Sequence, residues 1–195
     1  MTAQSNTRWS EALVALCRAI ISSHASDWPP TEEKIAEQCI SFFGLSALSS
    51  SEALTRLLED LGIKVSTSTL PKEFRGYHHC FGDQRMIIVA ESKALFLTHE
   101  HTLLHELREI LEHILQDLEF PTVQKESLET RAEAFAVSID RQTTTEFLKM
   151  LFDGAQKVQS KWRRWAAYAL LMVFGSVSLS SVSILPKLED ELERS

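Results

Sequence analysis

Apolar residues recur at intervals of three or four positions in three stretches near the start of the chain. This interval matches the period of an α-helix, so each stretch is predicted to form an amphipathic helix. The three helices are expected over residues 10–22, 31–43 and 51–61. Thr31 and Ser51 are suited to cap the second and third helices, and Gly62 is suited to end the third.

The hydrophobic period then changes from that of a helix to that of a strand. The stretch "IKVSTSTL" (63–70) alternates with period two and is rich in β-branched residues, which predicts a strand. The stretch "RMIIVAES" (85–92) has a continuous apolar run, which predicts a second strand buried on both faces. The intervening residues, 71–82, are expected to form a turn or loop.

The helical period returns in the second half of the chain. It predicts a helix over about 97–118, a second over 125–141 and a third over 143–154 that stops at Gly154. Helices therefore precede and follow a small sheet. The predicted fold class is α+β, with the sheet packed against helices.

The helix predicted over 97–118 carries the residues with chemical potential. Its leucines and isoleucines fall on one arc, and the opposite side holds a set of ionisable residues. That set is His105, Glu106, Glu109, Glu112 and His113. His105 and Glu109 are four residues apart and so lie one above the other, as two metal ligands on one helix must. Glu106 then occupies the usual position of a general base. The alternative interpretation is a solvated helix face with no chemistry.

Several segments around this helix resemble one known family. They are "LGIKV" (61–65), "TLLHEL" (102–107), His113 and "ETRAEAFA" (129–136). In this order they resemble the ImmA/IrrE family of metallopeptidase-like domains over roughly residues 50–145. The resemblance implies a zincin-like active-site helix, with zinc bound by two histidines of an HExxH motif and one carboxylate from a later helix.

Carried over position by position, those three ligand positions are His105, Glu109 and Arg131, and Glu106 is the implied catalytic base. Glu109 replaces a histidine but can still bind a metal. Arg131 replaces the carboxylate, and it cannot bind a metal because it stays protonated and has no acceptor lone pair. We therefore predict a Glu109–Arg131 ion pair in place of the metal, with no cofactor. The protein would be a pseudoenzyme that binds a regulatory partner without cutting it.

Two alternatives remain open at this point. In the first, zinc is retained by His105, Glu109 and Glu129, with Glu106 as general base, and the protein cleaves a repressor-type protein. Glu129 lies two residues before Arg131, which places it about 200° away around the helix. Because the family's third ligand is at the position of Arg131, this ligand set requires a local distortion of the helix. In the second, the chain is a plain helical interaction protein. The remaining candidate histidines are expected to be loop residues rather than ligands: His78, His79 and His99.

The C-terminal part contains an uncharged stretch over 165–185, which is long enough to cross a bilayer as a helix. Basic residues precede it, and by the positive-inside rule they place the preceding domain in the cytoplasm, anchored to the inner membrane. The alternative is a helix or strand buried in a soluble domain. The predicted organisation is a helical region (1–48), an ImmA/IrrE-like domain (49–154), a basic linker (155–164), a candidate transmembrane helix (165–185) and an acidic tail (186–195).

Composition narrows the choice of partners. The chain has 195 residues, 44% of them hydrophobic, and a formal net charge of −7, so direct nucleic-acid binding is not expected. Cys17, Cys39 and Cys80 form no metal-binding or disulfide pattern, which fits a reducing compartment. The resemblance implies a protein partner, a helix-turn-helix repressor of the kind that acts in stress responses.

Overall fold

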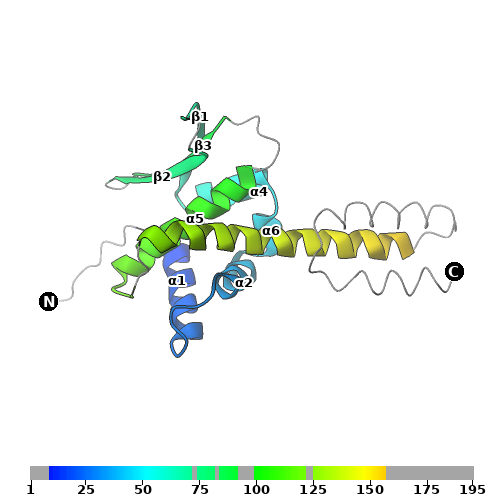
Figure 1. The fold of residues 1–195 in the computed structure, drawn as a ribbon, viewed down its shortest axis with the longest axis horizontal. Helices are drawn as coiled ribbons and strands as arrows, with labels where there is room; N and C mark the ends of the chain where they lie inside the picture. The colour runs from blue at the N-terminus through cyan, green and yellow to red at the C-terminus, as the bar shows by residue number, and fades with distance from the viewer. Residues whose placement is uncertain (1–8, 72–73, 82–83, 92–98, 122–124, 157–195) are drawn as a thin grey trace. The chain divides into compact units, whose positions relative to one another are not determined.

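The computed structural model describes residues 9–71, 74–81, 84–91, 99–121 and 125–156. The chain divides into two compact units, residues 1–140 and 141–195. The first unit is α+β, with helices around a small mixed sheet (Figure 1), as predicted. The candidate chemistry lies in this unit.

Three helices open the first unit close to the predicted positions: α1 (Glu11–His24), α2 (Glu32–Phe43) and, after the short α3 (Leu45–Leu48), α4 (Ser51–Asp60). The hydroxyl of Ser10 caps α1. The cap of α4 is Ser50 rather than the predicted Ser51, because the Ser50 hydroxyl accepts from the Ala53 amide at 3.2 Å. Gly62 ends α4 as predicted, with a φ of 79° that favours glycine.

The sheet contains β1 (Lys64–Ser68), β2 (Gly76–Phe81) and β3 (Gln84–Ala90) in the order β1-β3-β2. Strand β3 pairs parallel to β1 and antiparallel to β2. The two predicted strands are confirmed, but β3 is not buried on both faces as predicted, since Ile87 and Val89 are buried whereas the alternate positions are partly exposed. The loop predicted over 71–82 is wrong where β2 runs. The segment "GYHHCF" has no clear apolar alternation, and its extended form is stabilised by pairing with β3, a contact that local pattern does not reveal.

Helix α5 (His99–Asp117) lies at the centre of the first unit. It contacts α1 and α4 as well as strands β2 and β3, and Figure 1 shows it between the sheet and α1. One hydrophobic core joins α5 to α1, α2, α4, the sheet and the first part of α6. Residues 9–48 of the predicted N-terminal region (1–48) therefore share a core with the residues that follow instead of packing separately.

Helix α6 (Lys125–Gln156) replaces the two helices predicted over 125–141 and 143–154. No glycine or proline interrupts the chain where a break was expected. The hydroxyl of Thr145 donates to the Arg141 carbonyl at 2.8 Å, which accommodates a β-branched polar residue inside the helix.

None of the helices within the described residues is long and apolar enough to span a membrane. The predicted membrane segment (165–185) and acidic tail (186–195) lie outside the described residues. The predicted basic linker does so from residue 157 onward.

Candidate metal centre

Helix α5 is buried on nearly all sides, including the side that carries its ionisable residues. Glu106 is 5% exposed, Arg108 1% and Glu112 7%. The predicted apolar arc is confirmed, since Leu103, Leu107 and their neighbours along it are buried. The alternative of a solvated polar face is wrong for this helix, and its buried charges all require partners.

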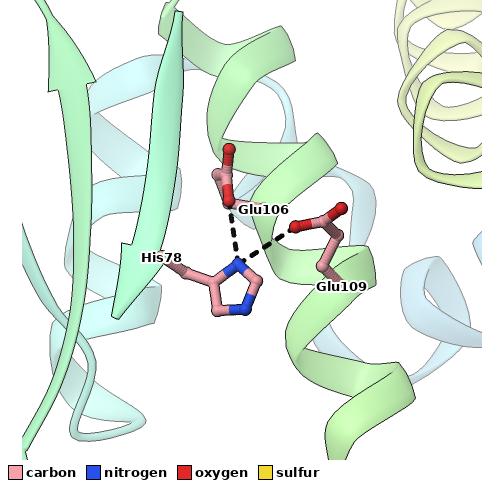
Figure 2. A group of neighbouring side chains, drawn as sticks. All are labelled: His78, Glu106 and Glu109. Carbon is pink, nitrogen blue, oxygen red and sulfur yellow. Dashed lines mark hydrogen bonds and ion pairs between the residues drawn. The ribbon is translucent and has the colours of Figure 1, made fainter. Parts of the chain in front are cut away.

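Strand β2 supplies a partner for two carboxylates of α5, Glu106 and Glu109. Figure 2 shows the imidazole of His78 pointing from the strand to a position between Glu106 and Glu109. Its Nδ1 lies 2.9 Å from Glu106 Oε2 and 3.1 Å from Glu109 Oε2. Both glutamates come from one face of α5, so a single strand histidine contacts two carboxylates.

The strand can approach the helix this closely because residue 76 is a glycine. A Cβ added there would lie 2.6 Å from Thr102 Cγ2 and 3.0 Å from the Ile88 carbonyl oxygen. The first distance is shorter than side-chain carbons tolerate, so with any other residue either the Thr102 side chain or β2 would have to shift. Gly76 thereby sets the separation across which His78 reaches the carboxylates.

These contacts determine the charge of the group. Burial alone would lower the pKa of His78, but hydrogen bonds to Glu106 and Glu109 and their charges raise it to about 9. Burial would raise the pKa of Glu109, but the hydrogen bond and charge of His78 lower it. Burial and the charge of His78 lower the pKa of His113, whose Nε2 lies 3.1 Å from His78 Nε2. At neutral pH, His78 is therefore an imidazolium between two carboxylates.

A second group forms around His105, where α6 packs beside α5. His105 Nε2 lies 3.9 Å from Glu109 Oε1 and 3.3 Å from Glu129 Oε2. His105 Nδ1 lies 3.7 Å from Glu133 Oε2. Glu129 and Glu133 are one turn apart and so share a face of α6, and that face is turned toward His105. No helix distortion is needed to bring Glu129 to this position.

Arg131 makes different contacts from those expected. Its Nε donates to Glu32 Oε1, and its Nη2 donates to the Pro30 carbonyl at 2.8 Å. The predicted Glu109–Arg131 ion pair is wrong, because Glu109 contacts His78 and His105 instead. The physical reason is the rotation of α6: the face that turns Glu129 and Glu133 toward His105 turns Arg131 toward the start of α2.

Glu32 belongs to a buried charge network that the sequence analysis did not identify. Arg108 Nε donates to Glu32 Oε2 at 2.7 Å, and Arg108 Nη1 donates to Glu112 Oε2 at 2.9 Å. Burial would lower the pKa of Arg108, but the contacts with Glu32 and Glu112 raise it. The network joins α2, α5 and α6, and it holds Arg131 through Glu32.

His101 forms a further contact between α5 and α6. Its Nδ1 lies 2.7 Å from Asp140 Oδ2, and its Nε2 lies 3.1 Å from Glu133 Oε1. The Asp140 hydrogen bond raises the pKa of His101 against the opposing effect of burial. His101 lies one turn before His105 on α5.

Among the residues that the structure describes, two sets of side chains have the composition of a cation site: His78, Glu106 and Glu109, and His105, Glu109 and Glu129. Within each set, the ligand-type atoms all lie within 4.8 Å of one another. A tetrahedral cation with bonds of about 2.1 Å separates its ligand atoms by roughly 3.4 Å, so the His105 distances fit such an ion with small adjustments. Imidazole nitrogen with carboxylate oxygen suits zinc and other first-row divalent cations.

The set around His105 contains the alternative ligands derived from the sequence. The set around His78 was missed, because His78 was assigned to a loop. One signal was present: in an extended segment, adjacent histidines point to opposite faces, so one of "HH" must face inward.

Comparison with known proteins assigns no family to this chain and no role to these residues. Neither a protein-family model, nor a curated protein, nor a solved structure matches the chain.

Proposed function

We propose that this chain is a metal-dependent hydrolase whose cation is held by His105, Glu109 and Glu129. The observation that carries the proposal is the convergence of these three side chains together with the engagement of Arg131 by Glu32. A lost metal site was expected because Arg131 replaces the third ligand and was expected to pair with Glu109. Arg131 contacts Glu32 instead, and Glu129 lies at His105, so a different carboxylate is present in the position of the third ligand.

The donor set is consistent with an open catalytic site. His105 and Glu109 are largely buried on α5, with side chains 18% and 14% exposed, whereas the Glu129 side chain is 69% exposed. When bound, a divalent cation supplies Lewis acidity and increases the acidity of a water molecule. The buried pair fixes the ligand geometry, and the exposed ligand marks the side from which a substrate approaches.

Glu106 is the residue proposed to take the proton of the attacking water, as the sequence pattern implies. His78 holds this carboxylate in place through a 2.9 Å contact. Peptide bonds are the proposed substrate class, and a repressor-type protein is the proposed partner. Both follow from the resemblance to the ImmA/IrrE family. Attachment to the inner membrane through residues 165–185 is proposed separately, from the hydropathy of that segment.

Metal content tests the proposal most directly. The untagged protein would be stripped with a chelator, equilibrated with zinc and analysed after gel filtration. We expect at least one tightly bound zinc per chain. His105→Ala and Glu129→Gln should each weaken binding at this site by tenfold or more, which corresponds to about 1.4 kcal/mol.

Glu37→Gln is a matched control, because Glu37 is exposed on α2 and belongs to neither set. It should leave zinc binding unchanged. Absence of bound zinc from the loaded wild-type protein would contradict the proposal.

A second candidate function is the binding of a regulatory partner without cleavage. It is favoured by one observation: both Glu106 and Glu109 are already paired with His78. An imidazolium then provides the positive charge that a cation would otherwise supply. Under this alternative, the zinc-equilibrated protein contains no metal, and Glu106→Gln and His105→Ala have no effect on partner binding.

A further inference from the structure

We propose a second divalent-cation site, formed by His78, Glu106 and Glu109, that shares Glu109 with the cation at His105. The inference rests on the proposed function for the first cation. It adds a carboxylate-bridged pair of cations, which the sequence pattern and the expected single-zinc site do not contain.

The second site is built from side chains that already converge. His78 Nδ1 lies 2.9 Å from Glu106 Oε2 and 3.1 Å from Glu109 Oε2 (Figure 2). The three side chains are only 14%, 7% and 14% exposed, respectively. Acidic groups that gather on a protein surface are solvated separately, whereas these are held together by packing between β2 and α5.

Glu109 connects the two sites through its separate oxygens. Oε2 faces His78 at 3.1 Å, and Oε1 faces His105 at 3.9 Å. A carboxylate that presents one oxygen to each of two cations bridges them, and such pairs in hydrolases are about 3.5–4 Å apart. Glu109 takes the position of a histidine in the HExxH pattern, and a histidine there offers one nitrogen to one cation. The glutamate that breaks the HExxH motif is therefore what permits a bridge.

The second ring nitrogen of His78, Nε2, also has a contact. Its Nε2 lies 3.1 Å from the Nε2 of His113, so it has a partner on the side away from the carboxylates. Metal-binding histidines usually donate their second ring N–H to a neighbouring group, which fixes the ring and its tautomer. A cation would take the place of the Nδ1 proton between the carboxylates, and that proton would leave to solvent.

In this arrangement Glu106 is a ligand, which replaces the general-base role proposed for it above and leaves the cation at His105 as proposed. The two roles predict different metal counts. Substitution of a general base leaves metal bound and removes activity, but substitution of a ligand removes one cation. Glu106→Gln therefore separates a one-cation site from a bridged pair without a substrate.

The experiment uses the full-length, untagged protein, stripped with a chelator and titrated with zinc by calorimetry and elemental analysis. We expect two zinc ions per wild-type chain, and one in His78→Ala and in Glu106→Gln. Glu109→Gln should weaken the binding of both zinc ions. His79→Ala is the matched control, since His79 is the exposed neighbour on the same strand, and it should retain two.

Loading with manganese provides a second measurement. A carboxylate-bridged pair should give an exchange-coupled paramagnetic resonance spectrum, which reverts to that of an isolated ion in His78→Ala. Circular dichroism would verify folding, and Glu106→Gln tests the same site if His78→Ala does not fold.

The outcomes distinguish the two proposals. One zinc per wild-type chain, unchanged by His78→Ala and Glu106→Gln, overturns the second site and leaves the proposed function standing. Two zinc ions that persist in both variants also overturn it, because the second ion then lies elsewhere. No bound zinc in the wild-type protein contradicts both proposals.

Discussion

At the residue scale, the decisive contacts are those of charged side chains that α5 buries. A buried charge is retained only when partners compensate for its lost hydration. His78 compensates Glu106 and Glu109, while Glu32 and Glu112 compensate Arg108. The two groups lie on different sides of one helix, so one can serve chemistry while the other joins helices.

The Glu32 network should make a large contribution to stability. Glu32→Gln removes the charge shared by Arg108 and Arg131, both of which remain in place. We expect a loss of about 3 kcal/mol in the free energy of unfolding, because removing one partner leaves buried charge uncompensated. Thermal denaturation should show a decrease of roughly 10 °C in Tm.

The control for this change is Glu33→Gln, at the exposed neighbouring position on α2. It should shift Tm by less than a degree or two. Equal Tm values for Glu32→Gln and Glu33→Gln would show that the network contributes little to stability.

The metal-free protein should lose stability as pH rises, because of His78. Its folded-state pKa, about 9, exceeds the ordinary value of 6.5. The contribution is therefore fully present below pH 6.5 and is lost as pH rises through 9. Each pKa unit corresponds to about 1.4 kcal/mol, so the contribution reaches about 3 kcal/mol.

Denaturant unfolding at pH 6 and pH 10, in the presence of a chelator, measures this effect. Other groups also titrate in this range, so the informative quantity is the difference in unfolding free energy between wild type and His78→Asn. It should be large at pH 6 and small at pH 10. The same difference at both pH values would show that His78 does not carry a proton in the folded state.

At the element scale, the close packing of β2 on α5 creates the site around His78. Sequence pattern predicts α5 and β3 well, since both have strong apolar periodicity. Strand β2 has little periodicity of its own, and its position depends on pairing with β3 and on Gly76. The site therefore depends on the element that local pattern predicts least well.

Gly76→Ala tests this dependence. The added methyl group would overlap Thr102 Cγ2, so the Thr102 side chain or β2 must shift, and we expect β2 to move away from α5. We expect a loss of about 1–3 kcal/mol in stability, as for other overpacked sites. We also expect weaker zinc binding by the His78 set, measured by calorimetry.

Ser68→Ala is a suitable control, because Ser68 is exposed on β1 and belongs to neither cation set. It should alter neither stability nor zinc affinity by a comparable amount. If Gly76→Ala behaves like Ser68→Ala, the strand has room to adjust and its spacing does not control the site.

At the scale of the whole molecule, the first unit and the C-terminal segment pose separate questions. The first unit has one core and contains every residue of the two cation sets. The uncharged stretch over 165–185 is known from its sequence alone. Its predicted role is to attach the protein to a membrane.

Detergent phase partitioning of the full-length protein tests the predicted anchor. We expect the wild-type protein in the detergent phase. The double substitution Leu171→Arg and Val173→Arg should move it to the aqueous phase, because each arginine near the centre of a membrane helix costs about 2.5–3.5 kcal/mol. Recovery of the wild-type protein in the aqueous phase would contradict the anchor.

The sequence by itself determined the α+β class, the positions of α1, α2, α4 and α5, and the candidate role of His105, Glu106 and Glu109. These follow from local periodicity and from spacing along one helix, which need no knowledge of distant contacts. Tertiary structure alone decided the partners of those residues. It rotated α6 so that Glu129 faces His105 while Arg131 faces Glu32, and it brought His78 to α5. Such pairings depend on how separate elements pack, and a buried charge takes whichever partner that packing brings within reach.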